Sequence, residues 1–189
     1  MGRKRQDEPE LPPPEPAVAF DIKIASGSQA LVAKDLFMSA QRFQKAAEVL
    51  SEHVSQNLEL HLGQPYAVVC AFSIELYLKC LLVMERGSYP RDHDLEELFR
   101  NLGSGTKGTL TRRFNSLDKK SNRRAAMRKD GFQTDMKTEL KRSKDAFELL
   151  RYAHEHESKK AAFGLSLLIP CLVQVIFEKQ PDWEGIPLI

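Results

Sequence analysis

The fold follows from one stretch of the sequence, Ala71-Phe72-Ser73-Ile74-Glu75-Leu76-Tyr77-Leu78-Lys79. This stretch lies in a segment, from Pro65 to about Arg86, that is apolar on nearly every side, as the central helix of a bundle is. Glu75 and Lys79 are four residues apart, so they share one helix face and can form an ion pair. Because a charge inside an apolar helix needs a partner, we expect Glu75 to be at least partly buried against a cation.

Further segments with helical periodicity surround this central helix. The predicted helices cover residues 30–54, 65–86, 94–103, 110–117, 135–156 and 161–179, with a loop at 103–108. The helix at 94–103 opens with a capping-box pattern, and His93 just before it is expected to pack or bond near that helix start. No stretch alternates with a period of two, so the sequence predicts an all-α, up-down bundle of four main helices plus short ones.

The chain divides into three parts by composition. Residues 1–18 are rich in proline and charge and are expected to be disordered, residues 19–180 form the bundle, and residues 181–189 form a tail broken by Pro and Gly. In that tail, Trp183 and Ile189 are expected to fold back onto the bundle. The uncharged stretch 161–177 is at the short limit for a membrane span and contains Pro170, so we expect a buried bundle helix and no membrane.

Cysteine usage and net charge exclude several classes of protein. The three cysteines have no close spacing, which argues against a disulfide framework and against a zinc site. The sequence therefore predicts no metal, no cofactor and a reducing compartment such as the cytoplasm. A net charge of +2 selects no partner by itself.

Basic residues nevertheless gather in one segment that contains few acids. They are Arg112, Arg113, Lys119, Lys120, Arg123, Arg124, Arg128 and Lys129. A cluster of this kind is either a solvated face or a surface that contacts the phosphates of a nucleic acid. We therefore predict RNA binding by this segment as one of two alternatives.

The segment Arg151-Tyr152-Ala153-His154-Glu155-His156 suggests a catalytic site. RNA cleavage without a metal needs a proton acceptor, a proton donor and a cation for the phosphate, and His and Arg supply these groups. Arg151 borders the buried face of its predicted helix, so we predict that its guanidinium pairs with Glu75. His154 nearly shares a helix face with Arg151, whereas His156 is about 140° away on an ideal helix and reaches that face only where the helix ends or bends. The alternative is a pair of exposed histidines at a frayed helix end.

Taken together, these segments resemble the HEPN (higher eukaryotes and prokaryotes nucleotide-binding) superfamily. The resemblance lies in Glu75-Leu76-Tyr77-Leu78-Lys79, then His93-Asp94-Leu95 with Leu98, then Phe147 followed by Arg151-Tyr152. It implies a bundle of four to five helices that often dimerises. In ribonuclease members an Arg is followed after four to six residues by a His, and two subunits join these motifs into a metal-independent endoribonuclease site.

The resemblance implies that Arg151 holds the scissile phosphate and that His156 is the general acid or base. Glu75 would orient Arg151, and His154 is a further catalytic candidate because it nearly shares a helix face with Arg151. Members of this kind occur in toxin–antitoxin and other defence systems, which implies a homodimer with an antitoxin or a nucleotidyltransferase as partner. Active members usually carry a small polar residue after the Arg, whereas this chain has Tyr152. Two alternative interpretations therefore remain. One is a non-catalytic HEPN-like module that binds a nucleotide, RNA or a partner protein, in which Arg151 is structural. The other is a helical protein that only oligomerises.

Overall fold

The computed structural model describes residues 28–57, 60–144 and 164–186. These residues form helices and no strand, which confirms the predicted all-α fold. The helices are α1 (Gln29–Asn57), α2 (Gly63–Arg86), α3 (Leu95–Arg100), α4 (Ser104–Lys120), α5 (Asn122–Lys129), α6 (Met136–Lys144) and α8 (Leu168–Lys179). Short 3-10 turns are η1 (Leu60–Leu62), η3 (Leu165–Leu167) and η4 (Pro181–Trp183).

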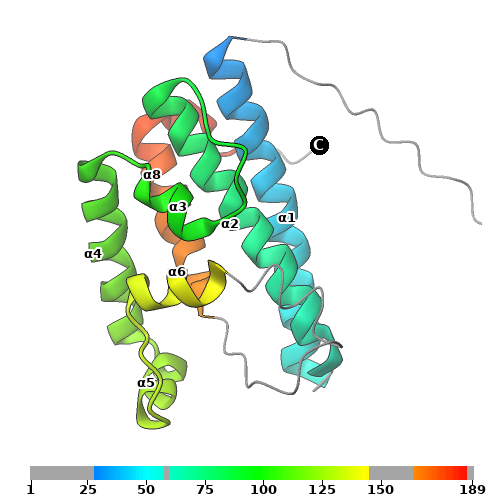
Figure 1. Cartoon of the computed structure of the whole chain (residues 1–189). Coiled ribbons are helices and arrows are strands. Elements are labelled where there is room, and N and C mark those ends of the chain that lie inside the picture. Colours follow the sequence, from blue (N-terminus) through cyan, green and yellow to red (C-terminus); the bar gives the residue numbers. More distant parts are fainter. Residues whose placement is uncertain (1–27, 58–59, 145–163, 187–189) are drawn as a thin grey trace, which may run out of the picture.

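The two longest helices, α1 and α2, lie side by side and carry the rest of the bundle (Figure 1). Helix α8 packs against α2, and α4 packs against α8. Small residues of α1 such as Ala33 and Ala40 are buried at helical spacing, which lets the two helices approach closely. The buried Ser73 hydroxyl of α2 donates a hydrogen bond of 2.9 Å to the carbonyl of Ala40, so this polar group is satisfied inside the α1–α2 contact.

Helix α2 is the buried centre that its sequence predicts. It ends at Gly87, which takes the left-handed conformation at φ 77° and donates its N–H to the carbonyl of Val83. By length and composition α2 is apolar enough to cross a membrane, but 72% of its most apolar window is buried inside the structure. It is therefore the core helix of the bundle. Helix α8 also packs into the core, where its Leu172 and Ile176 are fully buried.

The predicted loop at residues 103–108 is wrong, because α4 already begins at Ser104. The signal that starts this helix comes from α2. Glu85 accepts hydrogen bonds from the N–H of Gly103 at 2.8 Å and from the hydroxyl of Thr106 at 2.5 Å. This carboxylate supplies the acceptor and the negative charge that a helix N-terminus needs, so the glycines of this segment are held in a helix.

The cap made by Glu85 should make stability depend on pH. Burial alone raises the pKa of Glu85, but the hydrogen bonds from Thr106 and Gly103 and the nearby Lys179 outweigh burial and hold it below its usual 4.5. The cap therefore contributes stability above about pH 4.5, and that stability is lost as the pH falls through the lower folded-state value. Urea unfolding should show Glu85→Gln to be less stable by about 1 kcal/mol at pH 7. The difference should shrink at pH 3.

The exposed Glu184 gives the matched control for this measurement. Glu184→Gln should leave the free energy of unfolding unchanged within about 0.5 kcal/mol at both pH values. A constant deficit of Glu85→Gln between pH 7 and pH 3 would show that the charge of Glu85 has no part in the cap.

The end of the described chain returns to the core as predicted. Trp183 is 8% exposed, and its ring centroid lies 5.3 Å from that of Phe37 in α1. The tail is not wholly irregular, because Pro181–Trp183 forms a 3-10 turn. Ile189, the segment 1–18 and the part of the predicted 135–156 helix beyond Lys144 lie outside the described residues.

Candidate functional site

A buried ion pair on α2 forms the base of the candidate site. The Lys79 ammonium lies 2.7 Å from Oε1 of Glu75, and the two residues are 7% and 2% exposed. The Tyr89 ring covers this ammonium, with its centroid 5.3 Å from Nζ. The predicted burial of Glu75 against a cation is thus confirmed, with Lys79 as the cation.

His93 is the third member of this cluster; the sequence predicted that it would pack or bond near the start of α3, but not that its partner would be Glu75. Its Nδ1 lies 3.0 Å and 3.1 Å from the two carboxylate oxygens of Glu75, eighteen residues earlier. The side chain of His93 is nevertheless 66% exposed. His93 therefore links a buried carboxylate to the molecular surface.

The turn between α2 and α3 fixes the backbone of His93. Oδ1 of Asp92 accepts the N–H of His93 at 2.7 Å and the N–H of Asp94 at 3.0 Å. Asp94 in turn caps α3 by accepting the N–H groups of Glu96 and Glu97. This capping was predicted, and it sets the position from which His93 reaches Glu75.

The other catalytic candidates cannot be placed beside this cluster. Arg151, His154 and His156 lie outside the described residues. The predicted contact between Glu75 and Arg151 therefore stays a prediction. Among the described residues, Glu75 pairs with Lys79 and His93.

The basic segment falls on α4 and α5 and divides into exposed and paired residues. Arg112, Lys119, Lys120 and Lys129 are exposed. Arg113 pairs with Glu178 of α8, Arg128 bonds to Asp118 at 2.5 Å, and the side chain of Arg123 is outside the described part. Arg128 is exposed as well, but Asp118 holds it. The other four exposed cations form no ion pair among the described residues, and we call them the α4–α5 cations.

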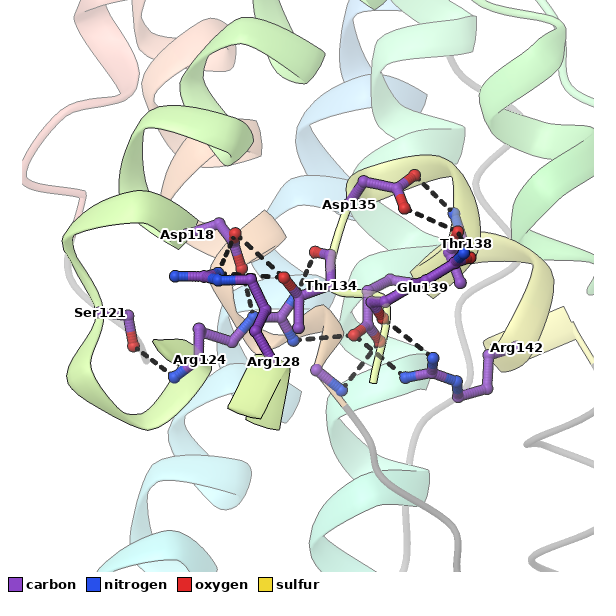
Figure 2. Close-up of polar contacts among 11 residues, drawn as sticks. Asp118, Ser121, Arg124, Arg128, Thr134, Asp135, Thr138, Glu139 and Arg142 are labelled. Atoms are coloured by element: carbon purple, nitrogen blue, oxygen red, sulfur yellow. Dashed lines mark hydrogen bonds and ion pairs between the residues drawn. The ribbon is translucent and has the colours of Figure 1, made fainter. Parts of the chain in front are cut away.

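Arg124 corrects the prediction for this segment, because its side chain points inward and is 3% exposed (Figure 2). Its Nε donates to Oδ1 of Asp118 at 2.6 Å, its Nη1 to Oε1 of Glu139 at 2.8 Å and its Nη2 to the carbonyl of Thr134. A guanidinium in this position holds α4, α5, the following turn and α6 together. It is not available to a phosphate.

Glu139 is the most deeply buried carboxylate of this network. It also accepts from Arg142 at 3.2 Å and from the N–H of Gly164 at 3.2 Å. Burial raises the pKa of Glu139, and the two guanidinium groups oppose that rise. A side chain at Gly164 would overlap Arg124 and Glu139, so glycine is required where the chain crosses this ion pair.

A shallow hollow lies beside this network, between α4, α5 and the turn before α6. Its wall includes Lys119, Arg128 and the ring of Phe132, together with the carboxylates of Asp118 and Asp135. Because the charges of this wall nearly balance, the hollow by itself does not select an anion. Of the α4–α5 cations, only Lys119 lines it, and Arg112, Lys120 and Lys129 lie outside it.

The described residues contain neither a metal-binding cluster nor a cysteine with a lowered pKa. No group of three or more His, Cys, Asp or Glu residues is arranged to hold a metal ion among them. Burial raises the pKa of Cys70 and Cys80 to about 12 and that of Cys171 to about 11, so these free thiols stay protonated at neutral pH. They act as small apolar core residues.

Comparison with known proteins agrees with this architecture. The family model of the HEPN domain matches residues 33–160, which is more than half of the chain. The matched region holds both the Glu75–Lys79–His93 cluster and the Arg151 to His156 segment. No curated protein and no solved structure gave a significant match. The chain belongs to the HEPN domain family.

Proposed function

We propose that this chain is a metal-independent endoribonuclease. Arg151 holds the scissile phosphate, and His156, with His154 beside it, transfers a proton. The observation that carries this proposal is the HEPN match over residues 33–160, which includes an Arg followed by a His five residues later. The α4–α5 cations support it, because exposed positive charge attracts the RNA backbone.

The proposal also covers the localisation, the oligomeric state and the partner of the protein. It places the protein in the cytoplasm as a homodimer, because the family builds its ribonuclease site from two subunits. An antitoxin or a nucleotidyltransferase is the partner that a toxin–antitoxin role requires. Light scattering on the purified chain tests the dimer, since a monomer would leave such a site incomplete.

Cleavage tests the reaction directly. The full chain in EDTA should cut single-stranded RNA and leave 2′,3′-cyclic phosphate ends, and His156→Ala should slow cleavage roughly 10²–10⁴-fold because one proton transfer is lost. Arg151→Ala should lower the rate and weaken phosphate binding. His61→Ala, at an exposed histidine of η1, is the control and should cleave at the wild-type rate. RNA left intact by the wild type would reject the proposal.

The contribution of the α4–α5 cations is separable from chemistry. The double change Lys119→Ala with Lys120→Ala should weaken RNA binding and reduce the slope of affinity against salt, because fewer counterions are released. Lys137→Ala, an exposed change on α6, should leave that slope unchanged. An affinity independent of salt would contradict this role.

A second candidate is a non-catalytic HEPN module that binds RNA, a nucleotide or a partner protein. Tyr152 favours it, because active members usually carry a small polar residue there. So does the pairing of Glu75 with Lys79 and His93, since it meets the charge of Glu75 within the described residues. RNA binding by the wild type with no cleavage of any RNA would select this candidate.

A further inference from the structure

The hollow between α4, α5 and the turn before α6 is a polar surface with an aromatic ring in its wall. Its volume is about 750 Å³, within the range of roughly 300–1,000 Å³ that is usual for small-molecule sites. Two cations of the wall, Lys119 and Arg128, are balanced by the carboxylates of Asp118 and Asp135. A hollow of this composition suits a group that is uncharged, polar at its edges and flat enough to lie on the ring of Phe132.

The end of α5 fixes the position of Phe132 at this hollow. Gly131 takes the left-handed conformation at φ 83°, and its N–H donates to the carbonyl of Arg128 at 3.1 Å. The N–H of Phe132 donates to the carbonyl of Met127 at 3.0 Å, which completes a glycine cap of the helix. The ring is half-buried, and the guanidinium of Arg142 lies 5.9 Å from its centroid. Phe132 is thus an aromatic side chain held in place at the surface rather than in the core.

The carboxylates of the wall are engaged within the protein. Asp118 accepts from Arg128 at 2.5 Å and from the hydroxyl of Thr134 at 3.1 Å (Figure 2). Asp135 accepts from the N–H and the hydroxyl of Thr138 at 3.1 Å and 2.7 Å, at the start of α6. These donors satisfy both acids, so the hollow is polar without presenting a strong negative charge to an incoming strand.

We propose that this hollow binds an unpaired base of single-stranded RNA. The base lies on the ring of Phe132, and the amides of Asn115 and Gln133 bond to its edge, because an amide both donates and accepts hydrogen bonds. Lys119 in the wall and Lys120 next to it in the chain hold the adjoining phosphates. This assignment rests on the RNA binding that the proposed function requires, and it specifies the substrate as a strand with unpaired bases.

A neutral hollow beside exposed lysines distinguishes a single strand from other polyanions. The α4–α5 cations by themselves attract any chain of phosphates, a duplex included. In a duplex the base faces are stacked on one another, so they are closed to a protein ring, whereas the bases of a single strand can turn outward and stack on it. An acidic peptide offers charge to the lysines but has no uncharged flat ring at every charge to fill the hollow.

The test separates bases from phosphates with two 2′-O-methyl RNA strands of equal length, one carrying uracil and one abasic throughout. A methylated 2′-oxygen cannot attack the phosphate, so affinity is measured without cleavage. With the full chain in EDTA, fluorescence anisotropy should show roughly 5- to 100-fold tighter binding of the uracil strand. Phe132→Leu should remove most of this preference, and Phe132→Tyr should keep it. Both variants should bind the abasic strand as the wild type does.

Further variants show that the preference belongs to this hollow. Asn115→Ala, at a half-exposed position, should lower the preference for uracil without changing the affinity for the abasic strand. Phe132→Leu should leave the slope of affinity against salt unchanged, whereas Lys119→Ala with Lys120→Ala should reduce that slope for both strands. Phe43→Leu removes a ring of α1 that is 37% exposed, and as the control it should match the wild type on both strands.

Three results would overturn the assignment. Equal affinity of the wild type for the two strands would show that only phosphates are bound, and RNA cleavage by the same protein would leave the proposed function intact. A preference for uracil that survives both Phe132→Leu and Asn115→Ala would place the base outside this hollow. A wild type that binds neither strand and cleaves no RNA would reject the proposed function and the base site together.

Discussion

Arg124→Ala should destabilise the protein by roughly 3–5 kcal/mol, because it leaves two buried carboxylates without their shared cation. Glu139 is fully buried and Asp118 nearly so, and Arg124 bonds to both. Arg128 and Arg142 each keep a bond to one of these acids, but both are partly exposed. The loss is large against a total stability of about 5–15 kcal/mol. Urea unfolding followed by circular dichroism measures it.

Matched variants show whether the loss comes from uncompensated charge. Lys120→Ala removes a nearby exposed cation and should change stability by less than about 0.5 kcal/mol. Adding Glu139→Met to Arg124→Met should restore much of the stability, since a buried pair replaced by apolar groups costs less than a broken pair. Gly164→Ala should also destabilise the chain, because its methyl group would overlap this pair. A cost of Arg124→Ala below about 1 kcal/mol would contradict the burial of the network.

Phe37→Ala should also cost roughly 3–5 kcal/mol, because it opens a cavity among aromatic rings. Phe37 is fully buried, and its ring centroid lies 5.9 Å from Tyr77, 5.7 Å from Phe177 and 5.3 Å from Trp183. These rings come from α2, α8 and η4, so one side chain joins four elements. Thermal or urea unfolding measures the change.

The fluorescence of Trp183, the only tryptophan of the chain, reports the same cavity locally. Phe37→Ala should shift its emission to the red as water reaches the indole, and Phe37→Leu should have a smaller effect. Leu31→Ala removes a half-exposed side chain of the same helix and serves as the control. Unchanged emission together with unchanged stability would show that the end of the chain does not pack on α1.

Some features could be predicted from the sequence because they depend on neighbours along the chain. The buried α2 and its Glu75–Lys79 pair follow from apolar composition and from a spacing of four residues. The cap of α3 by Asp94 follows from a local motif. The start of α4 was missed because its acceptor, Glu85, belongs to another helix.

The sequence by itself determined the helical class, the central helix and the family, since periodicity and motif order are properties of the linear chain. Only the tertiary structure decided which charges meet. Arg124 and Lys120 both belong to the basic segment of the sequence, but their environments differ. Arg124 is buried against Asp118 and Glu139, whereas Lys120 is exposed. It also placed His93 on Glu75. A buried charge is stabilised by whichever groups lie within hydrogen-bond reach in space, and that distance is set by helix packing rather than by separation in the chain.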